Sequence, residues 1–147
     1  MCQHIDHRRY EEVEHLTPRV QLALNVSDLE SAVEFYAKLF ARAPAKRRDG
    51  YANFALDEPP LKLVLIENAK SGGTLNHLGV EVGSTTDVVA ASERLSEEGL
   101  RTRSEHGTCC YALQDKVWVS DPDGAPWEFY TVLADSAGAE SDAEACC

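Results

Sequence analysis

The stretch VQLALNVSDLE (residues 20–30) decides the fold. VQLALNV is a strand-like run, and SDLE after it has the capping-box pattern, in which Ser27 is followed three positions later by Glu30. Apolar residues then recur at helical spacing. They are Leu29, Ala32, Val33, Tyr36, Leu39 and Phe40. The stretch therefore predicts a strand that leads directly into an amphipathic helix.

Two more strands complete the first half of the chain. YANFAL (residues 51–56) and LKLVLI (residues 61–66) are strand-like, and a turn at Asp57–Pro60 separates them. The basic run Lys46–Arg48 before them is expected to be a solvated loop or a strand edge.

The same order of elements occurs again in the second half. NHLGVEV (residues 76–82) is a strand-like run, and residues 84–86 precede a helix with its apolar face at Val88, Ala91 and Leu95. Gly99 is expected to end this helix. Four strand-like segments follow, with a strong turn at Asp121–Gly124. They are LRTRSE (residues 100–105), CYALQD (110–115), KVWVSD (116–121) and WEFYTV (127–132).

Although the second half has one strand-like segment more, we interpret each half as a βαβββ module, which predicts an α+β fold. When the halves are aligned, Gln21 lies opposite His77 in the first strands, and Lys62 lies opposite Glu128 in the last strands. Two such modules, at residues 19–70 and 74–135, are expected to form one curved mixed sheet around a central cleft, with the helices outside. Residues 1–18 are expected to be a flexible extension, and residues 136–147 a disordered acidic tail.

The composition excludes several classes of protein. The net charge of −11 argues against nucleic acid as a partner, because phosphate binding needs clustered Lys and Arg. No apolar run is long enough to cross a membrane, and no signal peptide is visible, so we expect a cytoplasmic protein. The five cysteines are a poor disulfide framework, being odd in number.

Two of these cysteines, Cys109 and Cys110, are adjacent in HGTCCY (residues 106–111). Neighbouring Cα atoms are about 3.8 Å apart, which is too close for an unstrained disulfide. Gly107 favours a loop in which both thiols face one target, and burial as two small apolar residues is the alternative. A second pair, Cys146–Cys147, ends the tail, where it either captures thiophilic species or has no role.

The sequence resembles the glyoxalase, or vicinal-oxygen-chelate, superfamily, in the DPDG turn and the Glu128 that follows it. Within that superfamily, several stretches of residues 19–135 resemble the organoarsenical C–As lyases and the actinobacterial cadmium-induced proteins. These stretches are RVQLALNVSDLE, FYAKLF, GYANFAL, PPLKLVLIEN, LNHLGVEV and QDKVWVSDPDG.

The resemblance to the lyases implies an activity. It implies that Gln21, His77 and Glu128 bind Fe(II), that O2 is a co-substrate, and that the carbon–arsenic bond of a trivalent organoarsenical such as methylarsenite is cleaved to give arsenite. Cys109 and Cys110 match the pair that binds the arsenical. The cadmium-induced proteins imply the alternative, a protein that sequesters cadmium or arsenic without turnover. Either protein is expected to be a monomer or a homodimer.

The candidate metal site departs from the superfamily's four-ligand pattern. Lys62 stands where the fourth ligand is expected, and an ammonium group has no lone pair for a metal. Three oxygen and nitrogen ligands leave open positions, which suit Fe(II) or Mn(II). Taken alone, His77 is more readily interpreted as a satisfied histidine within a strand, but its alignment with Gln21 and the motif at Glu128 favour a metal ligand. Lys116 is expected to be a solvated strand residue, and Trp118 either packs in the core or flanks an organic substituent.

Overall fold

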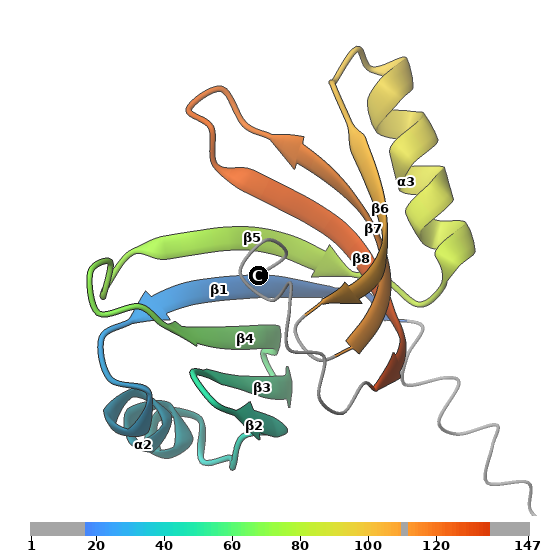
Figure 1. Cartoon of the computed structure of the whole chain (residues 1–147). Helices are drawn as coiled ribbons and strands as arrows, with labels where there is room; N and C mark the ends of the chain where they lie inside the picture. The colour runs from blue at the N-terminus through green and yellow to red at the C-terminus, as the bar shows by residue number, and fades with distance from the viewer. Residues whose placement is uncertain (1–16, 110–111, 136–147) are drawn as a thin grey trace, which may run out of the picture.

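The computed structural model describes residues 17–109 and 112–135, which form eight strands and two helices (Figure 1). The first half contains β1 (Arg19–Val26), α2 (Leu29–Phe40), β2 (Lys46–Arg48), β3 (Tyr51–Asp57) and β4 (Pro60–Glu67). The second half contains β5 (Leu75–Glu81), α3 (Thr85–Glu97), β6 (Arg103–Cys109), β7 (Ala112–Ser120) and β8 (Pro126–Asp135). The predicted βαβββ order is confirmed in both halves.

All eight strands belong to one mixed sheet with the order β2-β3-β4-β1-β5-β8-β7-β6. The first strand of each half lies at the centre, where β1 and β5 pair antiparallel. Each first strand also pairs parallel with the last strand of its own half, β1 with β4 and β5 with β8. The sheet is curved, and α2 and α3 lie on its outer side (Figure 1). The predicted α+β class and single curved sheet are therefore confirmed.

The apolar core lies between the helices and the outer face of the sheet. In the first half, Leu29 and Val33 of α2 pack with Phe54, Leu63 and Leu65 of β3 and β4. In the second half, Val88 and Ala91 of α3 pack with Val117 of β7. Each fully buried side chain of this size contributes roughly 1.5–3 kcal/mol relative to its exposed state. Because apolar side chains that pack against the helices occupy the outer face, the polar side chains of the central strands lie on the inner, concave face. Among the described residues, no helix is both long and apolar enough to cross a membrane.

The helix ends agree with the sequence in one half and differ in the other. Ser84 caps α3 by accepting a hydrogen bond from the Asp87 backbone, as predicted, and Gly99 follows the helix with a positive φ of 82°. The prediction that Ser27 caps α2 is wrong. The N-cap is Asp28, whose carboxylate accepts from the Ser31 backbone at 3.0 Å. Glu30 pairs with Arg47 at 3.5 Å and does not complete a capping box.

Two predictions around the cysteine pair are also wrong. CYALQD and KVWVSD are not separate strands, because β7 continues through residues 112–120 and pairs with β6 on one side and β8 on the other. Gly107 does not open a loop, since it lies within β6 opposite Gln114. The predictions for residues 1–16, 110–111 and 136–147 lie outside the described residues.

Candidate metal centre on the concave face

The three predicted metal ligands come from three neighbouring strands at the centre of the sheet. Gln21 lies on β1, His77 on β5 and Glu128 on β8. Gly79 of β5 pairs with both Gln21 and Glu128. His77 precedes Gly79 by two residues, so it faces the same side of the sheet. The topology therefore brings residues that are 56 and 107 positions apart into one cluster.

The polar atoms of these side chains converge. Gln21 Nε2 lies 2.9 Å from His77 Nε2 and donates to Glu128 Oε1 at 2.9 Å. His77 Nε2 lies 3.4 Å from Glu128 Oε1. All three residues are buried, with 2–4% of each exposed. The amide nitrogen of Gln21 thus lies between His77 Nε2 and the carboxylate oxygen of Glu128.

Lys116 supplies the opposite charge for Glu128. Its Nζ lies 2.8 Å from Glu128 Oε2, and both side chains are 3% exposed. Burial alone raises the pKa of Glu128, but the contact with His77 and the charge of Lys116 outweigh it and hold this pKa below its usual value. The expectation that Lys116 is solvated is therefore wrong.

Aromatic rings close the cluster on the β7 and β8 side. The Trp118 ring lies edge-on to the His77 ring, with the centroids 5.5 Å apart. Lys116 Nζ lies 5.3 Å from the Trp118 centroid and 5.9 Å from the Tyr130 centroid. Trp118 therefore packs directly against a predicted ligand.

A second polar cluster surrounds Glu81 and holds Lys62. Lys62 is the register partner of Gln21 across β1 and β4, and its ammonium donates to Glu81 Oε2 at 3.2 Å. Tyr130 donates to the same oxygen at 3.0 Å, and Arg19 donates to the other at 3.1 Å. Burial raises the pKa of Glu81, but Lys62 and Arg19 lower it further than burial raises it. Burial and the charge of Glu81 raise the pKa of Tyr130. Lys62 thus forms an ion pair with the carboxylate of Glu81.

The donor set fits a divalent cation with oxygen and nitrogen ligands. Adjacent ligands at about 2.1 Å from a metal, and at right angles to each other, are about 3.0 Å apart. The 2.9–3.4 Å separations of the three polar atoms match this spacing. An amide binds a cation through its oxygen, so Gln21 must turn its amide over to become a ligand. In the described part of the chain, no group of three His, Cys, Asp or Glu side chains could hold a metal ion. The candidate centre is not such a group, since its third member is Gln21.

The cysteine pairs are only partly described. Cys109 is the last residue of β6, and its backbone pairs with Ala112 of β7. Cys110, Cys146 and Cys147 lie outside the described residues. The structure therefore places the start of the vicinal pair at the end of the β6–β7 pairing.

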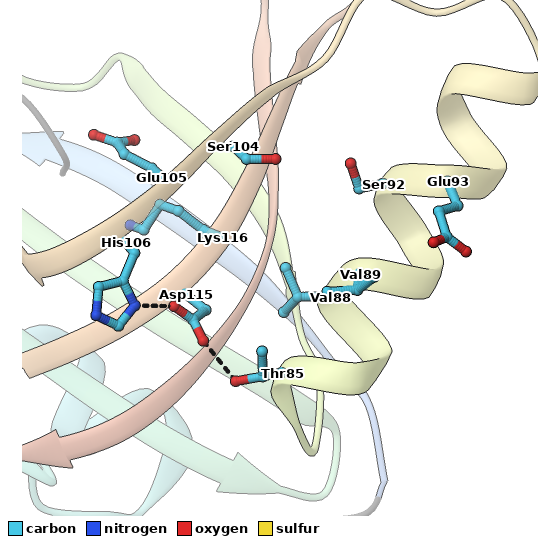
Figure 2. A pocket seen from close by; sticks show the side chains of 10 residues that line it. All are labelled: Thr85, Val88, Val89, Ser92, Glu93, Ser104, Glu105, His106, Asp115 and Lys116. Carbon is cyan, nitrogen blue, oxygen red and sulfur yellow. Dashed lines mark hydrogen bonds and ion pairs between the residues drawn. The ribbon is translucent and has the colours of Figure 1, made fainter.

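A separate hollow lies on the outer side of the sheet, between α3 and strands β6 and β7 (Figure 2). There Asp115 accepts from Thr85 at 2.5 Å and also contacts His106. Both contacts lower the pKa of Asp115, the one with Thr85 more. Asp115 and Lys116 are neighbours on β7, so their side chains project to opposite faces. This cluster ties β7 to the first turn of α3 and is not part of the candidate metal centre.

The comparison with protein families agrees with this architecture. Residues 14–129 match the profile described as the Glyoxalase/Bleomycin resistance protein/Dioxygenase superfamily. The chain belongs to this superfamily. Solved structures show the same fold at low sequence identity. An extradiol ring-cleaving dioxygenase from Brevibacterium fuscum is 22% identical with a TM-score of 0.60, over 84% of this chain and 36% of that chain. A superfamily member from Vibrio splendidus is 18% identical with a TM-score of 0.53, over 80% of this chain and all of the other.

Curated members of the superfamily are much more similar in sequence. "Cadmium-induced protein CadI" of Mycobacterium tuberculosis is 66% identical over 80% of this chain and 78% of the relative. "Trivalent organoarsenical cleaving enzyme" of Thermomonospora curvata is 58% identical over 88% of this chain and 87% of the relative. A probable enzyme of the same name from Bacillus subtilis is 38% identical over 87% of this chain. The predicted resemblance to both groups is confirmed.

Sequence reasoning missed several residues of the site. Lys116 contacts Glu128, and Asn76 contacts His77. Glu81 contacts Lys62, the lysine at the position of the fourth ligand. The roles of Lys116 and Glu81 depend on which strands are neighbours, which a single sequence does not state, whereas Asn76 contacts the adjacent residue in its own strand. For Lys116 there was one signal, the alternation along β7, which places it on the same face as Gln114 and Trp118.

Proposed function

We propose that the protein cleaves the carbon–arsenic bond of trivalent organoarsenicals such as methylarsenite, in a reaction that depends on Fe(II) and O2. The observation that carries the proposal is the convergence of Gln21, His77 and Glu128 within 2.9–3.4 Å on the concave face. The name of the 58% identical relative supports the choice of substrate. We place the reaction in the cytoplasm, where thiols stay reduced.

The reaction balances with one molecule of dioxygen. Methylarsenite and O2 together give arsenite and formaldehyde, so the carbon–arsenic bond breaks, the methyl carbon is oxidised and O2 is reduced. Gln21, His77 and Glu128 would hold the ferrous ion, which would supply redox chemistry and open coordination positions for this reaction. Both reactants then lie in one site, which removes much of the entropic cost of their encounter.

The protein's own residues have distinct parts in this proposal. His77 and Glu128 supply the nitrogen and carboxylate ligands, and Gln21 supplies a neutral amide oxygen. Lys116 holds Glu128 Oε2, which leaves Oε1 directed at the other two ligands. The thiols of Cys109 and Cys110 bind the arsenic atom by replacing its two hydroxyl groups, each of which leaves as water with the proton of the thiol.

The alternative is a protein that sequesters cadmium or arsenic through its thiols without turnover. The name of the 66% identical relative, a cadmium-induced protein, favours it. Sequestration by thiols needs no buried set of oxygen and nitrogen ligands. The presence of the buried cluster of Gln21, His77 and Glu128 is therefore the reason that we prefer the enzyme.

The test is arsenite release from methylarsenite by protein loaded anaerobically with Fe(II), with and without O2. We expect release that needs both iron and O2, and that is lost in His77→Ala and in Cys109→Ala/Cys110→Ala. Asp115→Asn, on the outer face, is the matched control and should keep the activity. Tight arsenical binding without any product would favour the sequestering protein.

A further inference from the structure

A chain of side-chain hydrogen bonds leads from His77 to the surface of the molecule. His77 Nδ1 lies 2.7 Å from Asn76 Oδ1. Asn76 Nδ2 donates to Asn25 Oδ1 at 3.0 Å, and Asn25 Nδ2 donates to Thr74 Oγ1 at 2.9 Å. Thr74 Oγ1 donates to the backbone carbonyl of Ser71 at 2.5 Å. Beyond His77, this series of hydrogen bonds passes through three side chains and ends at a backbone carbonyl group.

The last link sets the direction of every other link. A carbonyl group only accepts, so the hydroxyl hydrogen of Thr74 is committed to Ser71. Thr74 Oγ1 must then accept from Asn25, whose oxygen is thereby turned toward Asn76. The amide of Asn76 is oriented in the same way, so its oxygen faces His77 Nδ1.

The orientation of Asn76 determines the tautomer of His77. Because Asn76 presents an acceptor, neutral His77 carries its proton on Nδ1 and keeps the lone pair on Nε2. On the other side of the ring, the donor Gln21 Nε2 lies 2.9 Å from His77 Nε2, whereas the acceptor Glu128 Oε1 is farther away at 3.4 Å, so the nearer contact matches a lone pair on Nε2. An unprotonated Nε2 is the form that a metal ion needs.

The backbone holds this chain in place. The backbone N–H of Asn25 donates to the backbone carbonyl of Thr74 at 2.8 Å, and the backbone N–H of Gly73 donates to the backbone carbonyl of Asn25 at 2.9 Å. The turn before β5 is thus fixed to the end of β1 by main-chain bonds as well as by the side chains. Asn25 is also buried, with 7% of it exposed, so its amide has little access to competing water.

We infer that Asn76, Asn25 and Thr74 are positioning residues that fix His77 as the Nδ1–H tautomer and so present Nε2 at the centre of the site. The tautomer follows from the hydrogen bonds alone, whereas its use for a metal rests on the proposed function. Removing a residue that positions a metal-binding histidine typically lowers the metal affinity by about 10–100-fold.

The test reads the tautomer directly in the metal-free protein. Two-bond proton–nitrogen NMR correlations of ¹⁵N-labelled protein distinguish Nδ1–H from Nε2–H in the His77 ring. We expect Nδ1–H in the native protein and in Asn76→Asp, whose carboxylate still accepts from Nδ1. Asn76→Leu, which has no acceptor, should shift the ring toward Nε2–H. Native protein in the Nε2–H form, or an unchanged tautomer in Asn76→Leu, would overturn the inference.

A Co(II) titration of the same variants gives the second readout. In the Cys109→Ala/Cys110→Ala background, we expect affinity about 10–100-fold lower in Asn76→Leu and close to native in Asn76→Asp. A purely structural role would lower the affinity of both variants along with their stability, and it would contradict the inference. If the native protein has the Nδ1–H form but binds no Co(II), the proposed metal site fails and the assignment of the tautomer stands.

Discussion

Gly79 lies between Gln21 and Glu128 in the sheet, and a Cβ atom at this position would meet Glu128 Cγ and the Glu128 carbonyl oxygen at 2.9 Å. The same Cβ would lie 3.4 Å from Gln21 Nε2. Two of the proposed ligands therefore approach each other through space that only a glycine leaves open.

Gly79→Ala should therefore lower stability and weaken metal binding. Forcing an extra methyl group into a packed interior costs about 1–3 kcal/mol, and here it displaces Glu128 from Gln21. Urea unfolding and a Co(II) titration measure the two effects. Val80→Ala, whose side chain lies on the other face of β5, is the control and should keep the native affinity. Native Co(II) affinity in Gly79→Ala would contradict this account of the site.

Lys116→Met should destabilise the protein strongly. It leaves the buried carboxylate of Glu128 without its ion pair, and breaking such a pair costs about 3–5 kcal/mol. The combined change Lys116→Met/Glu128→Met should cost much less than the sum of the two single changes. A double-mutant cycle of unfolding free energies measures this coupling, and additive single effects would show that the pair is not coupled.

Glu81→Gln should change how stability depends on pH. Because Lys62 and Arg19 hold the folded-state pKa of Glu81 below 4.5, the native protein gains stability from this carboxylate above about pH 4.5. That gain is lost as the pH falls through the lowered pKa. The free energies of unfolding of native protein and Glu81→Gln should thus differ most near pH 7 and converge in acid.

Urea unfolding at several pH values measures this difference. Glu97→Gln, at an exposed position of α3, is the control and should change stability by less than about 0.5 kcal/mol. A gap between native protein and Glu81→Gln that does not shrink toward low pH would rule out this role for Glu81.

Cys109→Ala/Cys110→Ala should separate the two halves of the proposed site. The ligand set of Gln21, His77 and Glu128 contains no sulfur, so we expect Fe(II) affinity to be unchanged. Binding of methylarsenite, measured by equilibrium dialysis, should be lost. Joint loss of iron and arsenical would mean that the thiols belong to the metal site.

Much of the fold could be predicted from the sequence because its signals are local. The apolar periodicity of residues 29–40 and the capping residue Ser84 depend on neighbours within one turn of helix. Both predictions hold except at Leu39, which was placed on the apolar face but is 58% exposed. The repeat added long-range information. It aligned Gln21 with His77, and their side chains are in contact.

The errors occurred where tertiary pairing overrides local preference. Gln114, Asp115 and Lys116 are polar and favour a break between strands, but each is within hydrogen-bonding or ionic reach of a partner once β7 lies between β6 and β8. The buried ion pair of Lys116 and the hydrogen bond between Asn76 and Asn25 could not be predicted either, because in each case the partner lies on another strand.

The most direct test of the central claim is a calorimetric titration of Fe(II) under anaerobic conditions into Cys109→Ala/Cys110→Ala protein, with and without the further change His77→Ala. We predict that the protein with His77 binds one equivalent of Fe(II), and that His77→Ala loses this binding while remaining folded. Equal Fe(II) binding with and without His77 would contradict the claim that Gln21, His77 and Glu128 form the metal centre.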